Sequence, residues 1–374
     1  MENLTHTLVG LAVAKAGAER ASPYATAVCL IAANAPDADI IAAVDGWCTY
    51  LHHHRGITHS VVGTLALALL IPVLFWGGDR LLARLRHRAP RARLRGLMLA
   101  SLLACATHPL LDWTNNYGVR PWLPFNNRWH YGDLVFIVDP YLWLILGGAG
   151  FLLASRTAWQ KALWIVLALV LTALIYLVPA RGRFDLPLAT RIIWLAGLFA
   201  IALSARARVA ERWGNKLAIG ALAAVALYWI ALSVFHGAAV EKARARAESI
   251  ARGERIERLA AMPTLADPTR WRVVFETERA VYRFELRLWG EAAEQGDSTL
   301  RYEKPRGREA EAVARAADEH RCAAIFLDFA RFPVAQVLFD CPRRILVRLA
   351  DLRYTEPNGE RNFSLDAEIP CAAR

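Results

Sequence analysis

Long apolar runs with almost no charge constrain this chain more than any other feature. They extend from Val61 to Trp76, Leu134 to Ala154, Leu163 to Pro179, Ile192 to Ala205 and Leu217 to Phe235. Each run approaches or reaches the roughly 20 residues that cross a bilayer as a helix. The hydrophobic content of 56% and the mean hydropathy of +0.25 are also high for a soluble protein. The sequence therefore predicts an all-α polytopic transmembrane bundle over residues 1–236.

Three shorter helices complete this predicted bundle and give eight apolar segments in all. The first covers Asn3–Ala18, the second follows the break at Ser22-Pro23 and ends near Ala35, and another covers Gly96–Asp112. No cleavable signal peptide is expected, because the N-terminal region carries Glu2 and no Lys or Arg ahead of the first helix. The first helix should therefore stay attached.

The net charge of +11 is explained by the loops between the apolar runs. Seven arginines fall between residues 80 and 95, within one short connector, which is typical of a cytoplasmic loop that faces anionic lipid. No nucleic-acid partner is expected. A cytoplasmic connector orients the protein in a bacterial inner membrane, although the mixed connector Arg181–Arg191 argues mildly against this orientation.

Ionisable side chains cluster at the ends of the predicted helices. His6 lies in the first turn of the first helix, and the second helix ends in Pro36-Asp37-Ala38-Asp39. The segment His54–Ser60 (His-Arg-Gly-Ile-Thr-His-Ser) precedes a long span, and His108-Pro-Leu-Leu-Asp112 closes the next one. The spacing of His108 and Asp112 puts both side chains on one face of a helix.

The topology brings these groups to one side of the membrane. With the arginine-rich connector inside, the span after His59 runs inward and the span ending at Asp112 runs back out. A hairpin of the first two helices places His6 and Asp37 on the same extracytoplasmic face. Ionisable groups at membrane depth are costly and usually functional.

Imidazole and carboxylate groups together favour a divalent metal, with zinc first and manganese or iron as alternatives. The candidate metal ligands are His6, Asp37, His54, His59, His108 and Asp112, and the candidate catalytic residues are Asp37, Asp39 and Arg55. Arg55 could hold a substrate phosphate or simply face lipid headgroups. A bound metal would activate water, which favours hydrolysis.

The four motifs, Thr5–Gly10, Pro36–Asp39, His54–Ser60 and His108–Asp112, resemble those of the bacterial inner-membrane family described as membrane-bound metal-dependent hydrolases. The resemblance covers residues 1–155 and implies a multi-spanning protein with a metal-dependent hydrolase site. The motif order is also similar, more distantly, to that of the zinc-dependent phospholipase C and nuclease group. That likeness implies ligand roles for His6, Asp37, His59, His108 and Asp112. The chain lacks the N-terminal Trp ligand of the phospholipase, and His130 with Asp133 or Asp139 only loosely replaces its final histidine cluster.

Beyond Gly237 the sequence predicts a charged helical stalk over 237–262 and a soluble α+β domain over 263–374. Strands are expected in Arg272–Trp289, Ala323–Phe329, Gln336–Asp340 and Arg344–Tyr354, and a helix is expected in Glu309–His320. Cys29, Cys48 and Cys105 are expected to be buried or incidental thiols. A disulfide between Cys322 and Cys341 is compatible with an oxidising compartment.

These features predict a membrane-embedded metal-dependent hydrolase that acts at the extracytoplasmic face on a phosphoester, with lipid among the candidate substrates. The C-terminal domain is expected in the periplasm, and membrane lipid is the expected partner. The alternative is a non-enzymatic metal-binding membrane protein, such as a transporter or an envelope-stress factor. Almost no polar ligands occur between Leu134 and Phe235, which favours the enzyme. No oligomeric state is indicated.

Overall fold

The computed structural model describes residues 1–180, 186–289, 299–357 and 363–371, and its contacts divide the chain into two compact units. Unit 1 comprises Met1–Asp39, Arg55–Val234 and Pro263–Pro268. Unit 2 comprises Ile40–His54, Phe235–Met262 and Thr269–Arg374. This division differs from the predicted sequential one, because a segment near the N-terminus belongs to the unit that contains the C-terminal sheets.

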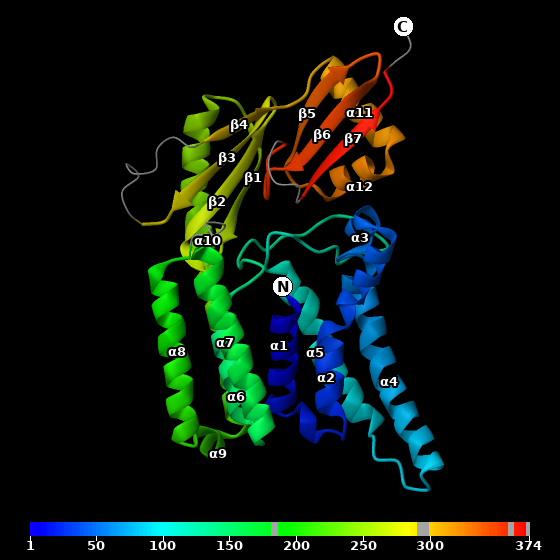
Figure 1. Ribbon diagram of the computed structural model, residues 1–374, viewed down its shortest axis with the longest axis vertical. Coiled ribbons are helices and arrows are strands. Elements are labelled where there is room, and N and C mark those ends of the chain that lie inside the picture. The colour runs from blue at the N-terminus through cyan, green and yellow to red at the C-terminus, as the bar shows by residue number, and fades with distance from the viewer. Residues whose placement is uncertain (181–185, 290–298, 358–362, 372–374) are drawn as a thin grey trace. The chain divides into compact units, whose positions relative to one another are not determined.

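Unit 1 is an all-helical bundle, as predicted (Figure 1). Its elements are α1 (Asn3–Ala16), η1 (Ala18–Arg20), α2 (Ala25–Asn34), the start of η2 (Ala35–Asp45), η3 (Ile57–His59), α4 (Val61–Leu85), α5 (Leu94–Trp113), α6 (Pro140–Ala154), α7 (Ala158–Ala180), α8 (Leu188–Arg206), α9 (Val209–Trp213) and the first part of α10 (Asn215–Ala251). Many large apolar side chains of α4, α7 and α8 are exposed, as is usual for residues that face lipid.

Within the described residues, six helical segments are long and apolar enough to cross a membrane. They are Ala25–Asp45, Val61–Leu85, Leu94–Trp113, Ala158–Leu177, Leu188–Arg206 and Asn215–Ala251. Helix α6 is apolar but shorter, because the predicted segment from Leu134 stays irregular until Asp139 caps the helix through the backbone N–H groups of Tyr141 and Leu142. The chain is therefore a multi-pass membrane protein.

Close helix packing in unit 1 positions the polar motifs. Helix α1 packs on α2, and a Cβ at Gly10 would lie 2.8 Å from the carbonyl oxygen of Cys29. Helix α4 begins so close to η3 that a Cβ at Gly63 would lie 1.8 Å from the carbonyl oxygen of Ile57. Only glycine permits these two approaches without movement of the backbone. As a result, the ends of α1, α2, η3 and α5 lie together.

Unit 2 is an α+β domain with two antiparallel sheets (Figure 1). One sheet has the order β1-β2-β3-β4, and the other has the order β5-β6-β7. The bounds are β1 (Ile256–Thr264), β2 (Asp267–Thr277), β3 (Ala280–Arg287), β4 (Leu300–Glu303), β5 (Pro333–Asp340), β6 (Arg344–Asp351), β7 (Ser364–Ile369), α3 (Trp47–His53), α11 (Arg308–Glu319) and α12 (Arg321–Phe329). Four alanines of α10, spaced four residues apart from Ala239 to Ala251, pack against the first sheet.

Two expectations for this region were wrong. Residues 323–329 are helical rather than a strand, and they bury Ala323, Phe326 and Phe329 at helical spacing. The predicted stalk is the end of α10 and stops at Ala251, because the turn that follows contains Gly253 at a φ of 91°. Residues 256–262 of the predicted stalk belong to β1 instead.

The cysteines of unit 2 pair differently from the suggested bond. Cys48 of α3 is bonded to Cys322 of α12, and Cys341 is bonded to Cys371. The suggested Cys322–Cys341 bond is therefore wrong, as is the expectation that Cys48 is an incidental thiol. Cys29 and Cys105 are free and buried, as expected.

Candidate metal centre

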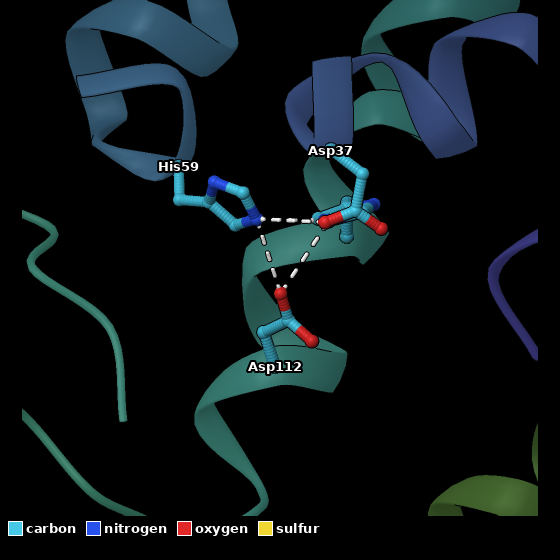
Figure 2. Close-up of side chains that lie close together, drawn as sticks. Asp37, His59 and Asp112 are labelled. Carbon is cyan, nitrogen blue, oxygen red and sulfur yellow. Dashed lines mark hydrogen bonds and ion pairs between the residues drawn. The ribbon is translucent and has the colours of Figure 1, made fainter. Parts of the chain in front are cut away.

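Four ionisable side chains from three separate segments of unit 1 meet at one point. They are Asp37 of η2, His59 of η3, and His108 and Asp112 of α5, and one ligand atom from each lies within 4.8 Å of the others. Figure 2 shows the side chains of Asp37, His59 and Asp112 pointing toward one another. His59, His108 and Asp112 are fully buried, whereas the side chain of Asp37 keeps 13% exposure.

The distances within this cluster match the ligands of a single small cation. The Nε2 atoms of His59 and His108 are 3.1 Å apart. Each of these nitrogens also lies 3.2–3.5 Å from a carboxylate oxygen of Asp37 and of Asp112. Zinc bonds of about 2.0–2.1 Å in a tetrahedron place neighbouring ligand atoms roughly 3.3 Å apart. Five of the six separations in the cluster therefore have the expected length.

The buried polar atoms of the cluster face one another. Oδ2 of Asp112 is buried, and it lies 3.2 Å from Nε2 of His59 and 3.4 Å from Nε2 of His108. A buried carboxylate that faces two imidazole nitrogens needs a bound cation or a proton to balance its charge. Because two imidazoles and two carboxylates are suitable donors for a divalent cation, the residues present fit a metal ion.

Surrounding groups fix the orientation of both histidine rings. Nδ1 of His108 lies 2.6 Å from the carbonyl oxygen of Ala33, so the ring donates there and turns Nε2 toward the cluster. Nδ1 of His59 lies 3.3 Å from Oδ2 of Asp39. Asp39 thus contacts the ring nitrogen of His59 that faces away from the cluster, as carboxylates outside the ligand shell do in many metal sites.

The electrostatics favour positive charge at the centre. Burial alone would lower the pKa of His59, but hydrogen bonds with the surrounding carboxylates, of which Asp112 contributes most, raise it to about 10. A proton on this ring and a metal ion are therefore alternative ways of balancing the same carboxylates.

Arg55 is buried and contacts the cluster directly. Its Nη2 lies 3.0 Å from Oδ1 of Asp112, and its Nη1 donates to Oδ1 of Asn115 at 2.9 Å. Its backbone N–H donates to Oδ2 of Asp39 at 3.0 Å. Arg55 thus holds Oδ1 of Asp112, whereas His59 and His108 contact Oδ2 of the same carboxylate. Asn115 was not among the predicted site residues, although its position three residues after Asp112 was a usable signal.

His6 lies at the edge of the cluster. Its ring stacks on His108 with centroids 3.7 Å apart, and its Nε2 is 3.4 Å from Oδ1 of Asp112. The amino group of Met1 contacts the same carboxylate oxygen, a contact that the residue pattern did not indicate.

The remaining candidates lie outside the group of four. His54 belongs to unit 2, where it caps α3 and stacks on Tyr50 with ring centroids 4.6 Å apart. His130 forms an isolated bridge with Val119, and Asp139 caps α6.

Comparison with known proteins agrees with the membrane assignment. Residues 1–184 match the family described as "YdjM inner membrane protein". One relative, the "Uncharacterized protein YfhP" of Bacillus subtilis (strain 168), is 28% identical over 152 residues, which are 38% of this chain and 43% of the relative. The chain thus spans less than half the length of that curated relative, and no solved structure matches. The N-terminal 184 residues of this multi-pass membrane protein are therefore similar to the YdjM family of inner membrane proteins.

Proposed function

We propose that this protein is a membrane-embedded metal-dependent hydrolase that cleaves a phosphoester. The observation that carries the proposal is the buried cluster of two imidazoles and two carboxylates with nitrogen and oxygen atoms 3.1–3.5 Å apart. Zinc is the first candidate, with manganese or iron as alternatives. When bound, the ion would supply a Lewis acid that activates water and polarises a phosphoryl oxygen.

Each protein group has a distinct part in this proposal. Asp37, His59, His108 and Asp112 would hold the ion. Asp39 orients His59, and Arg55 positions Asp112 rather than contacting substrate, because its guanidinium group is already bonded to Asp112 and Asn115. Asp37 has the only partly exposed side chain of the four, so we expect water and substrate to approach from its side.

An apolar groove in unit 1 favours a lipid as the substrate. It has a volume of about 440 Å³ and lies among α6, α7 and α8, where Leu8, Trp143, Trp164 and Trp194 are among its lining residues. The indole Nε1 of Trp143 donates to Oε1 of Glu2 at 2.5 Å. Glu2 caps the helix whose first turns carry His6. A lipid chain in this groove would therefore lie near the first turn of α1.

The disulfides favour an extracytoplasmic position for the site. Disulfides persist in oxidising compartments, and both bonds lie in unit 2. One of them holds Cys48, which lies in the segment between Asp39 and Arg55. A periplasmic C-terminal domain follows from the same reasoning. Alkaline phosphatase fused after residue 371 should be active, and an inactive fusion with a fluorescent cytoplasmic reporter would reverse the orientation.

The test of function begins with metal content. Elemental analysis of detergent-purified wild type should find bound zinc, manganese or iron, and His59→Ala and His108→Ala should lose it. The metal-loaded wild type should then hydrolyse a chromogenic phosphodiester or phosphatidylglycerol in mixed micelles, and both variants should be inactive. Absence of metal from wild type, even after metal is added, would overturn the proposal. Bound metal without hydrolysis would favour a metal-binding transporter or envelope-stress factor.

A further inference from the structure

Unit 2 contains a large cleft beside the end of α10. It has a volume of about 1100 Å³ and lies among the last turns of α10, the turn between β2 and β3, and the start of β4. Five arginines line it, namely Arg246, Arg252, Arg255, Arg279 and Arg301. They come from three separate parts of the chain, so the fold itself gathers them.

The cleft carries an excess of positive charge. Its described lining has five guanidinium groups and two carboxylates, Glu254 and Glu278, and Arg301 is also paired with Glu303 outside the lining, which leaves a net charge of +2. Many arginines elsewhere in this unit are paired with an acidic side chain, as Arg301 is. Examples are Arg258 with Glu276, Arg283 with Glu356, Arg315 with Glu319, Arg344 with Glu368 and Arg353 with Asp351. The excess positive charge is therefore a property of the cleft and not of unit 2 as a whole.

The arginines of the cleft also keep donors available. Arg252 and Arg255 are exposed, and neither has a charged or hydrogen-bonded partner within the described residues. The Nε atom of Arg279 is 3.9 Å from its nearest carboxylate oxygen, on Glu254. Arg246 lies over the ring of Phe284 at 4.6 Å, which holds its guanidinium plane in a fixed position.

We propose that this cleft binds a multiply charged phosphate ligand larger than inorganic phosphate, either a polyphosphate or a phosphate on a larger body. Guanidinium groups present paired N–H donors that match phosphate oxygens, and several together can neutralise a multiply charged ligand. The volume exceeds what a single phosphate fills, so the ligand has at least two phosphates or a phosphate with a larger body. A soluble polyphosphate and the headgroup of an anionic lipid share this chemistry. The cleft shares no residue with the metal centre.

The test uses the full-length protein in neutral detergent with inorganic tripolyphosphate as the probe. Calorimetry should show saturable binding to wild type. The double variant Arg252→Gln/Arg255→Gln should bind at least about tenfold more weakly, because charge-assisted hydrogen bonds are lost. The matched control is Arg315→Gln/Arg344→Gln, which removes the same charge from ion pairs outside the cleft and should bind within about twofold of wild type.

Dihexanoyl phosphatidic acid, used below its micelle concentration, separates the two sources. If it displaces tripolyphosphate at lower concentration than pyrophosphate does, the ligand is a lipid headgroup. If pyrophosphate displaces the probe at lower concentration, the ligand is soluble, and both results support the site. Equal weakening in the two double variants would overturn the proposal, as would the absence of saturable binding to wild type. Unchanged thermal unfolding of the variants would show that loss of binding does not reflect misfolding.

Discussion

The substitution Asp39→Asn tests whether a carboxylate that contacts a metal ligand, rather than the metal itself, strengthens metal binding. Oδ2 of Asp39 accepts hydrogen bonds from the backbone N–H of Arg55 at 3.0 Å and from Oγ1 of Thr58 at 3.2 Å, and it lies 3.3 Å from Nδ1 of His59. Asparagine keeps the shape of the side chain but removes the charge that supports the imidazole. Outer carboxylates of this kind typically change metal affinity by about 10- to 100-fold, which is roughly 1.4–2.7 kcal/mol.

We therefore expect Asp39→Asn to bind metal with unchanged stoichiometry and about 10- to 100-fold lower affinity. Competition against a chelator of known zinc affinity measures this change in purified protein. Asp45→Asn is the matched control, because it makes the same chemical change on an exposed side chain and should leave affinity unaltered. The reasoning fails if Asp39→Asn binds as tightly as wild type. It also fails if this variant loses the metal completely, as His108→Ala should, because Asp39 would then be a direct ligand.

Two further predictions concern packing. Gly63→Ala should reduce both metal content and melting temperature, because the new methyl group would meet the carbonyl oxygen of Ile57 in the turn that carries His59. Gly77→Ala in the same helix is the control. A Cβ at this position has no atom within 4 Å, so neither metal content nor melting temperature should change. Arg353→Met should destabilise unit 2 by about 3–5 kcal/mol, since it leaves a buried carboxylate unpaired. The same change at Arg344, whose ion pair is half exposed, should leave thermal and denaturant unfolding almost unchanged.

The sequence contained most of the information on the metal centre. The spacing of His108 and Asp112 predicted one helix face, and the structure places both side chains in the cluster. The position of His59 just before an apolar span was equally informative. His54 lies outside this group of four, and its role as a metal ligand stays a prediction.

The errors in the fold have physical causes that residue patterns only partly reveal. The segment Ala323–Phe329 is short and apolar, and such runs fit strands and buried helices alike. The pairing of Cys48 with Cys322 spans 274 residues, and no local pattern encodes a contact at that separation. By contrast, Asp139 followed by Pro140 is an ordinary helix start, so the beginning of α6 could have been predicted from the sequence.

The bond between Cys48 and Cys322 has an evolutionary consequence. Cys48 lies within the region that matches the inner-membrane family, residues 1–184, whereas Cys322 lies outside it. A homologue without residues equivalent to 263–374 has no partner for a thiol at position 48, and an exposed unpaired thiol is a liability in an oxidising compartment. We therefore expect cysteine at these two positions to be gained and lost together, so that the residue at position 48 indicates whether a family member carries the C-terminal sheets.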